Sequence, residues 1–402
     1  MASRKNSTRP FDTFLPMLLA KGHHLAYCGN IHRGETWPET FSALNEYTLA
    51  VKQRVSPSAP FGIGLRLSDL ASRELSDEAV LTDFQKWLER HDCYVFTING
   101  FPFGRFHGQR VKEQVYVPDW TTTERLEYTN RLFDLLARLV PPGVEGSVST
   151  LPGSFKEFIT TPKQESAICS NIWRCVEHIA ALSEKTGRTL HLGLEPEPLC
   201  FLETTDETVE FFERLRSEHL EDPRLASHLG VNYDTCHLAV EYENPRESLE
   251  KLRRHGIKIS KFHLSSALKM RPTPSARAAV TAFSENVYLH QVIARAAGGG
   301  LTRFRDLDAA LASADSAEEW RVHFHIPLQC VASEWFDTTA DHLLAVLDVL
   351  GADPRICPHL EMETYTWEVL PSALKSRNVV DQLSAEYEWC LAQLRTRGLV
   401  RQ

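Results

Sequence analysis

Short apolar segments alternate with longer amphipathic segments along nearly the whole chain, and this alternation constrains the fold more than any other feature. The short segments are rich in β-branched or aromatic residues, as strands are. The longer segments carry apolar residues at i, i+3 and i+4, the spacing of a helix with one buried face. Strands that alternate with helices form parallel βαβ units, so the pattern predicts an α/β fold. The nine expected strands begin at residues 23, 61, 93, 144, 189, 228, 257, 321 and 357.

Nine expected strands fit a (β/α)8 TIM barrel in which one strand belongs to an insertion. The unusual stretch is 267–320, which contains "RPTPSARAA" and the break "AAGGGL". We therefore expect an N-terminal tail over 1–20 and a single barrel domain over 21–402, with an insertion at about 267–320, before the last strand. A doubly wound open sheet is the alternative. That fold normally has a glycine-rich phosphate turn after its first strand, and "CGNIHRGETW" is not such a turn.

Composition limits the partners that the chain is expected to have. The 402 residues are 43% hydrophobic, and the net charge of −9 is spread without an acidic block, which argues against a nucleic-acid partner. The stretch "FLPMLLAKGHH" is too short for a membrane span or a signal core. The nine cysteines include no C-x-x-C pair and are interpreted as reduced thiols of a cytoplasmic protein. The formation of a homo-oligomer stays an open possibility.

The expected strands end in polar residues, and from the fifth strand onward these are all carboxylates and imidazoles. In a TIM barrel, functional side chains come from the carboxyl ends of the strands and from the loops that follow them. Buried carboxylates that converge in one barrel mouth repel one another unless a cation lies between them. Carboxylates with one or two imidazoles suit Mn, Mg, Co or Fe, and Zn as well. The strand ends carry Asn30, His32, Arg66, Asn99, Thr150, Glu195, Glu197, Asp234, His237, His263, His325, Glu361 and Glu363.

Each of the metal-ligand candidates also has a structural interpretation. In "LEPEP", either glutamate can form a salt bridge in a loop, and this reading is stronger for Glu197 than for Glu195. In "DTCH", Asp234 can cap the helix that follows it. His263 can be a hydrogen-bonded histidine of the core.

Two further choices stay open. Glu361 and Glu363 lie two apart and point to the same side of a strand. Glu363 is nearer the carboxyl end, so it is the favoured ligand. His323 and His325 share one side of their expected strand in the same way. His325 competes with His263 for the metal, or it supports a ligand or contacts the substrate.

The order of these motifs resembles the xylose-isomerase-like TIM-barrel superfamily, which includes sugar isomerases, ketose 3-epimerases and endonuclease IV relatives. The matching motifs are "GLEPEP", "YDTCH", "KFHLSS" and "LEMETYTW". In the epimerase branch, the last four strands hold a divalent metal, and the histidine of the D-T-x-H motif contacts the substrate. The resemblance therefore implies contact with substrate for His237, and metal ligation by Glu195, Asp234, His263 and Glu363 (or Glu361).

The whole chain is also similar to a narrower family, the EboE-type metabolite traffic proteins. The matching stretches include "HHLAYCGNIHRGETW", "NGFPFGRFHGQRVKEQVYVPDW", "VHFHIP" and "HLEMETYTWEVLP". This resemblance implies a role in handling a metabolite, with partner proteins from the same gene cluster. Two features depart from the epimerase pattern: the long insertion, and "VHFHIP", which has no counterpart in the small epimerases. Because of these two departures, the third metal ligand can be either His263 or His325.

Together these features predict a divalent-metal-dependent isomerase or epimerase that abstracts a proton next to a carbonyl of a small sugar-like metabolite. Glu195 and Glu363 are the expected acid–base pair, and His237 is expected to orient a hydroxyl. The alternative is a non-catalytic metabolite-binding protein that retains the pocket and the metal. A nuclease is disfavoured, because it needs a basic groove. The expected substrate contacts are Asn30, His32, His107, Lys112 and His325, and Arg105 is near them in the same loop as His107.

Overall fold

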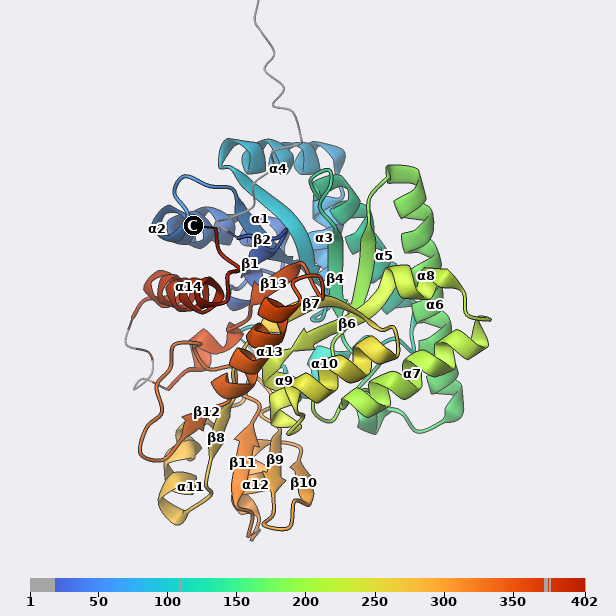
Figure 1. Cartoon of the computed structure of the whole chain (residues 1–402). Helices are drawn as coiled ribbons and strands as arrows, with labels where there is room; N and C mark the ends of the chain where they lie inside the picture. The colour runs from blue at the N-terminus through green and yellow to red at the C-terminus, as the bar shows by residue number, and fades with distance from the viewer. Residues whose placement is uncertain (1–18, 109, 315, 372–374, 376, 402) are drawn as a thin grey trace, which may run out of the picture.

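Eight parallel strands form a closed barrel, which confirms the predicted fold (Figure 1). The computed structural model describes residues 19–108, 110–314, 316–371, 375 and 377–401. The first strand pairs with both the second and the last barrel strand, and this closes the sheet. Around the barrel the order is β1-β13-β7-β6-β5-β4-β3-β2. The strands are β1 (His24–Cys28), β2 (Phe61–Arg66), β3 (Cys93–Asn99), β4 (Gly146–Thr150), β5 (Leu190–Leu194), β6 (Leu229–Asp234), β7 (Lys258–Leu264) and β13 (His359–Met362).

Helices surround the barrel and bury their apolar faces against it (Figure 1). On α5, for example, Leu132, Phe133 and Leu136 are fully buried. Local signals set where these helices begin: Thr204 and Glu207 form a capping box at the start of α7. The helices are α1 (Trp37–Ala43), α2 (Leu49–Val55), α3 (Asp69–Leu75), α4 (Glu78–Arg90), α5 (Thr123–Leu139), α6 (Pro162–Thr186), α7 (Thr205–Glu218), α8 (Pro223–His228), α9 (Thr235–Val240), α10 (Pro245–Arg254), α13 (Ala340–Ala352) and α14 (Val379–Thr396).

A second sheet lies between β7 and α13, to one side of the barrel (Figure 1). It is antiparallel, has the order β10-β9-β11-β8-β12, and packs around its own apolar cluster, which includes Val292, Trp320 and Phe324. We call the segment from β8 to β12 the insertion. Its elements are β8 (Leu268–Met270), α11 (Pro274–Val280), β9 (Val292–Arg295), β10 (Leu301–Phe304), α12 (Leu307–Ala312), β11 (Glu319–Val322) and β12 (Asp337–Thr338).

The insertion is longer than the stretch 267–320 that we expected, because it continues to Thr338. The apolar segment "RVHFHIPL" forms the end of β11 and the loop after it, so it is part of the second sheet and not of the barrel. Most of the expected tail, residues 1–18, lies outside the described residues. Leu19 is buried and forms an antiparallel bridge with Val400.

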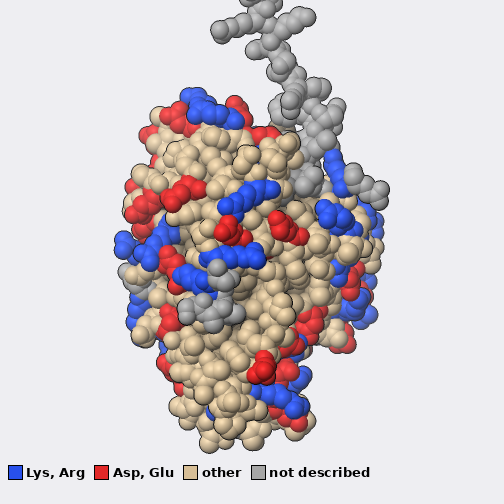
Figure 2. Space-filling view, turned by 90° about the vertical axis from the view of Figure 1, so that its left-hand side faces the viewer, with Lys and Arg blue, Asp and Glu red and all other residues tan. Residues whose placement is uncertain are grey.

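The surface carries both signs of charge. On the face drawn in Figure 2, Lys and Arg side chains are interspersed with Asp and Glu side chains. Within the described parts of the chain, no helix has the length and apolar character that crossing a bilayer requires. The nine cysteines are all free thiols.

Candidate metal centre at the barrel mouth

Four side chains from consecutive barrel positions meet at the carboxyl ends of β5, β6, β7 and β13. They are Glu195, Asp234, His263 and Glu363, all buried, and we call them the carboxylate cluster. One ligand atom from each lies within 4.8 Å of the others. Nδ1 of His263 lies 2.9 Å from Oε1 of Glu195, 2.9 Å from Oε2 of Glu363 and 3.4 Å from Oδ2 of Asp234. The strand register explains this meeting, because Asp234 and His263 are direct neighbours on β6 and β7.

The carboxylate cluster fits a divalent cation. Three carboxylates this close repel one another, and the single Nδ1–H of His263 cannot satisfy all of them. Oε2 of Glu195 and Oδ2 of Asp234 are buried, and no described residue donates a hydrogen bond to either. Buried carboxylate oxygens without donors are costly unless a cation balances them. Three carboxylates with one imidazole form a donor set for Mn, Mg, Co or Zn.

Asp234 uses its two oxygens for two purposes. Oδ1 caps α9: it accepts hydrogen bonds from the backbone N–H of Cys236 at 2.7 Å and of His237 at 3.1 Å. It also accepts a hydrogen bond from the hydroxyl of Ser265 at 2.6 Å. These bonds fix the carboxylate so that Oδ2 faces the carboxylate cluster. The cap and the candidate ligand are therefore one residue, and the two interpretations of the sequence are compatible.

Glu361 and Glu363 lie at different depths in the barrel. Glu361 accepts a hydrogen bond from Nε2 of His263 at 3.2 Å and forms a buried ion pair with Lys261. Gly64 on β2 makes room for it, because a Cβ there would lie 1.9 Å from Oε1 of Glu361. Glu361 thus orients the ring of His263 so that Nδ1 faces the mouth. Burial raises the pKa of Glu361, but Lys261 and His263 outweigh it and lower that pKa to about 2.

Glu363 is held by two amides. Oε1 accepts hydrogen bonds from Nδ2 of Asn30 at 2.7 Å and from Nδ2 of Asn99 at 3.2 Å, while Oε2 faces His263. Burial raises the pKa of Glu363 to about 7. The two glutamates of "LEMET" therefore have opposite shifts, because only Glu361 has a lysine beside it.

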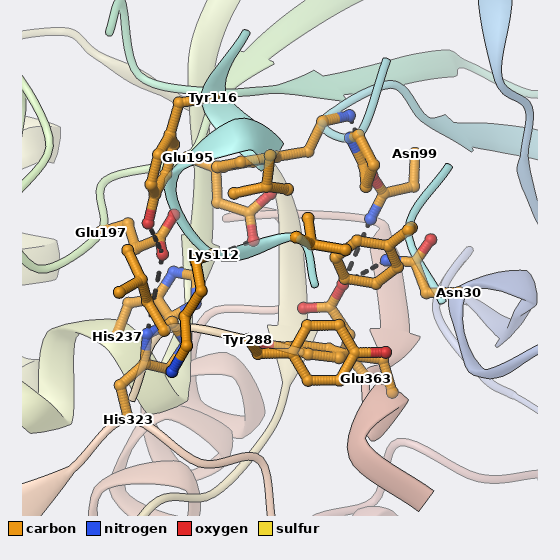
Figure 3. A pocket seen from close by; sticks show the side chains of 17 residues that line it. Asn30, Asn99, Lys112, Tyr116, Glu195, Glu197, His237, Tyr288, His323 and Glu363 are labelled. Carbon is orange, nitrogen blue, oxygen red and sulfur yellow. Dashed lines mark hydrogen bonds and ion pairs between the residues drawn. The ribbon is translucent and has the colours of Figure 1, made fainter. Parts of the chain in front are cut away.

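A pocket opens directly onto the carboxylate cluster. In Figure 3, Glu195 and Glu363 point toward the same central space, with Asn30 and Asn99 on one side of it and His237 and His323 on the other. The remaining wall is mostly aromatic and aliphatic. Such a pocket, polar at its base and apolar around it, is typical of a binding site for a small molecule. The apolar and aromatic lining residues are Phe101, Pro102, Phe106, Val111, Val115, Tyr116, Tyr288, Leu289 and Tyr365.

The expected substrate contacts are divided between this pocket and its surroundings. Asn30, Lys112 and His237 line the pocket. The ammonium of Lys112 is already engaged by the insertion, since Nζ lies 2.6 Å from Oδ2 of Asp306 and 2.9 Å from the carbonyl oxygen of Glu285. His32, Arg105 and His107 line a separate outer cavity. That cavity shares Phe106 and Tyr288 with the inner pocket, so these two rings stand between them.

His325 lies beside the carboxylate cluster but is not one of its four members. Its Nδ1 donates a hydrogen bond to the carbonyl oxygen of Glu363 at 2.9 Å. His263 and not His325 therefore meets the three carboxylates in this structure.

Sequence reasoning undervalued Glu197 and did not find Tyr116 or Gln291. Oε1 of Glu197 accepts hydrogen bonds from the Tyr116 hydroxyl at 2.7 Å and from Nε2 of Gln291 at 3.4 Å, and burial raises its pKa to about 7. The signal for Glu197 was its position two residues after Glu195, on the same side of the chain. Tyr116 and Gln291 come from a loop and from the insertion, for which strand spacing carries no signal.

Comparison with known proteins supports the fold. No protein-family model matches the chain, and no curated protein sequence does. A xylose-isomerase-like TIM-barrel protein from Mycobacterium smegmatis in complex with magnesium is similar, with 12% identity and a TM-score of 0.51 over 93% of this chain and 97% of that one. A D-tagatose 3-epimerase-like protein has 14% identity and a TM-score of 0.50 over 93% and 98%. The IOLI protein with a bound zinc atom has 13% identity and a TM-score of 0.49 over 93% and 98%.

At these identities the likeness concerns the fold alone: the chain is a TIM barrel, as are these two neighbours with TM-scores of 0.50 and 0.51. Membership of the EboE-type family stays a prediction from the sequence motifs.

Proposed function

We propose that the protein is a divalent-metal-dependent isomerase or epimerase that moves a proton next to a carbonyl group of a small sugar-like metabolite. The observation that carries this proposal is the position of Glu195 and Glu363, two carboxylates that line one pocket and share one cation-fitting cluster. Asp234 and His263 would complete the ligand set. A bound Mn, Mg, Co or Zn ion would supply Lewis-acid polarisation of the substrate carbonyl. The magnesium-bound neighbour of the same fold supports this choice of cofactor.

The two glutamates are set up differently for proton transfer. The amides of Asn30 and Asn99 hold Oε1 of Glu363 in place, so its carboxylate has one orientation in the pocket. Oε2 of Glu195 receives no hydrogen bond from the described residues and is therefore available to accept a proton. One glutamate removes the substrate proton and the other returns it. His237 lines the same pocket, where the family resemblance implies contact with a substrate hydroxyl.

The walls of the pocket would protect this chemistry from water. Phe106 and Tyr288 stand between the inner pocket and the outer cavity, and Tyr365 packs against both rings, with centroid distances of 5.2 and 5.3 Å. Exclusion of water strengthens electrostatic interactions in a site and limits the loss of a proton to solvent. His32, Arg105 and His107 lie in the outer cavity on the far side of these rings, and they would contact only a part of the substrate that extends past Phe106 and Tyr288.

Deuterium uptake tests the proposal directly. The manganese-loaded protein is incubated in D2O with a panel of 2-ketohexoses and 2-ketopentoses, and exchange at the carbon next to the carbonyl is followed by NMR. We expect exchange with at least one sugar, and a loss of about 100-fold or more in Glu195→Gln and Glu363→Gln. Glu145→Gln is the control, because Glu145 does not line the pocket and pairs with His191 and Lys258.

Binding of a ketose without exchange would contradict the enzymatic proposal. It would favour the alternative from the sequence, a metabolite-binding protein of the EboE type that acts with partner proteins of its gene cluster. The cytoplasmic location and a homo-oligomeric state are further predictions from the sequence.

A further inference from the structure

The outer cavity is much larger than the inner pocket. Its volume is about 980 Å³, against about 50 Å³ for the inner pocket. A water-sized group needs about 10–15 Å³ on this scale, so the inner pocket takes about four such groups, fewer than a hexose has. The outer cavity lies within the usual range for a small-molecule site, about 300–1,000 Å³. The inner pocket therefore fits the reacting end of a substrate, and the outer cavity has room for a further unit.

The two spaces adjoin at two aromatic rings. Phe106 and Tyr288 line both spaces, and their ring centroids lie 5.2 Å apart. His107, on the side of the outer cavity, connects them further: its Nε2–H donates to the carbonyl oxygen of Asn30, and its Nδ1 accepts a hydrogen bond from the Tyr288 hydroxyl. A substrate that extends past these two rings from the inner pocket enters the outer cavity.

The lining of the outer cavity carries equal numbers of positive and negative side chains. Among the described residues, four cationic side chains and four glutamates line it. His32 and His107 add no charge near pH 7, because burial lowers their pKa values to about 3 and about 4. Arg33 and Glu368 pair with each other at 2.7 Å. A ligand of either charge would meet like charges here, so the balanced lining favours a neutral ligand.

Two buried polar atoms of this lining have no partner among the described residues. Arg66 is 4% exposed, and its two terminal nitrogens donate to the carbonyl oxygens of Gly34 and Gly104. Its Nε–H has no acceptor, and Oε2 of Glu35 has no donor. Each unmatched group costs free energy. Both residues line the outer cavity, and a ligand with several hydroxyl groups suits both, because a hydroxyl donates and accepts.

Aromatic side chains supply the apolar part of the lining. Tyr47 and Trp367 are half-buried and line the outer cavity. The ring of Tyr47 stacks on that of His32, with centroids 4.5 Å apart. Flat rings of this kind pack against the C–H faces of a sugar ring, while the hydroxyls of the sugar reach polar groups around it. The lining thus combines the contacts that a neutral sugar unit needs.

We propose that the outer cavity binds a second, neutral polyhydroxylated unit of the substrate, so that the substrate is a glycosylated sugar-like metabolite. The reacting unit lies at the carboxylate cluster, and in this respect the assignment rests on the proposed function. The link between the two units would lie beside Phe106 and Tyr288. Arg66 and Glu35 would bind hydroxyls of the second unit. A free monosaccharide lacks these contacts and binds more weakly.

Calorimetric titration of the manganese-loaded protein tests this site. The probes are fructose and two disaccharides that keep a free ketose unit, isomaltulose and lactulose. We expect at least one disaccharide to bind about tenfold or more tightly than fructose, because its second unit adds hydrogen bonds and buries apolar area in the outer cavity. Fructose 6-phosphate is the anionic probe, and we expect it to bind more weakly than that disaccharide.

Two variants test whether the preference for the disaccharide arises in the outer cavity. Ser42 is exposed on α1 and lines this cavity, so Ser42→Trp fills the space of the second unit without changing the core, and the preference should disappear. Glu35→Leu removes the unmatched acceptor and should reduce the preference by about 5- to 10-fold. Ser170→Trp is the matched control: Ser170 is exposed on α6 and lines neither space, so this variant should keep the full preference.

Equal affinity for fructose and both disaccharides, or a preference retained in Ser42→Trp, would overturn the proposal. Tighter binding of fructose 6-phosphate than of either disaccharide would also overturn it and make the outer cavity an anion site. A disaccharide preference in a protein that exchanges no deuterium would support the outer site and contradict only the proposed reaction. Deuterium exchange with fructose but no disaccharide preference would contradict only the outer site. Absence of binding by every probe would contradict both.

Discussion

The carboxylate cluster and three histidines beside it, His237, His323 and His325, are built in different ways. Every member of the carboxylate cluster lies at the end of a barrel strand, in positions that the strand register brings together. Of the three histidines, one comes from α9, just after β6, and two come from the insertion. The first group depends on the barrel alone, and the second depends on how the insertion packs against the barrel. A site of the first kind is more predictable from sequence than a site of the second kind.

Asp234→Asn should have the largest effect, because Asp234 belongs to the carboxylate cluster and also caps α9, the helix that carries His237. Asparagine keeps an oxygen for the cap of α9, so the free energy of unfolding of the apoprotein should change by about 1 kcal/mol or less. The anionic Oδ2 is lost, and we expect weaker metal binding at the carboxylate cluster and a loss of deuterium exchange of about 1,000-fold. Elemental analysis and the D2O assay measure these changes. Unchanged metal content in Asp234→Asn would show that Asp234 does not bind the metal.

Glu361→Gln should distinguish a residue that only orients a metal ligand, His263, from a residue that binds the metal itself. It leaves the buried ammonium of Lys261 without its counter-charge, so we expect a cost of about 3 kcal/mol in the free energy of unfolding. It also removes the carboxylate that orients His263, which should weaken metal binding at the carboxylate cluster by about 10- to 100-fold. Chemical denaturation and metal titration test both effects.

The double variant Lys261→Met with Glu361→Gln is the control for the charge effect. It removes both charges, so most of the lost stability should return while metal binding stays weak. Equal loss of stability in the single and double variants would show that the ion pair is not what Glu361→Gln disrupts.

Glu197→Gln should have the smallest effect of the three. Glu197 does not belong to the carboxylate cluster, and a glutamine oxygen can still accept the hydrogen bond of Tyr116. We expect the metal content to remain unchanged and deuterium exchange to fall by about tenfold or less. A loss of exchange comparable to that of Glu195→Gln would mean that the two glutamates of "LEPEP" act together, and Glu197 would then have to be counted with the carboxylate cluster.

Much of the barrel and of the carboxylate cluster could be predicted from the sequence. Eight apolar segments in βαβ order specify a barrel, and the barrel places Glu195, Asp234 and Glu363 at one end. The choice between Glu361 and Glu363 could not be made from spacing, since both face the same side of β13. It depends on Lys261 and on the room left by Gly64, which come from other strands.

The insertion accounts for most of what the sequence did not predict. The residues of "RVHFHIPL" alternate as a barrel strand would, but the strand pairs with β8 and β9 in the second sheet. Lys112 lines the pocket, and its contact with substrate stays a prediction, but its ion pair with Asp306 of the insertion was not predicted. Both outcomes depend on contacts between segments far apart in the sequence, which local patterns do not record.

The measurement that tests the central claim most directly is an anomalous difference map from a crystal of the protein soaked in Mn ion. The account predicts a peak enclosed by Glu195, Asp234, His263 and Glu363, at ordinary ligand distances from all four side chains. The same crystal of Glu363→Gln should show that peak weakened or absent. A map with no peak there, or with Mn bound only elsewhere on the molecule, would contradict the claim that these side chains form a metal centre.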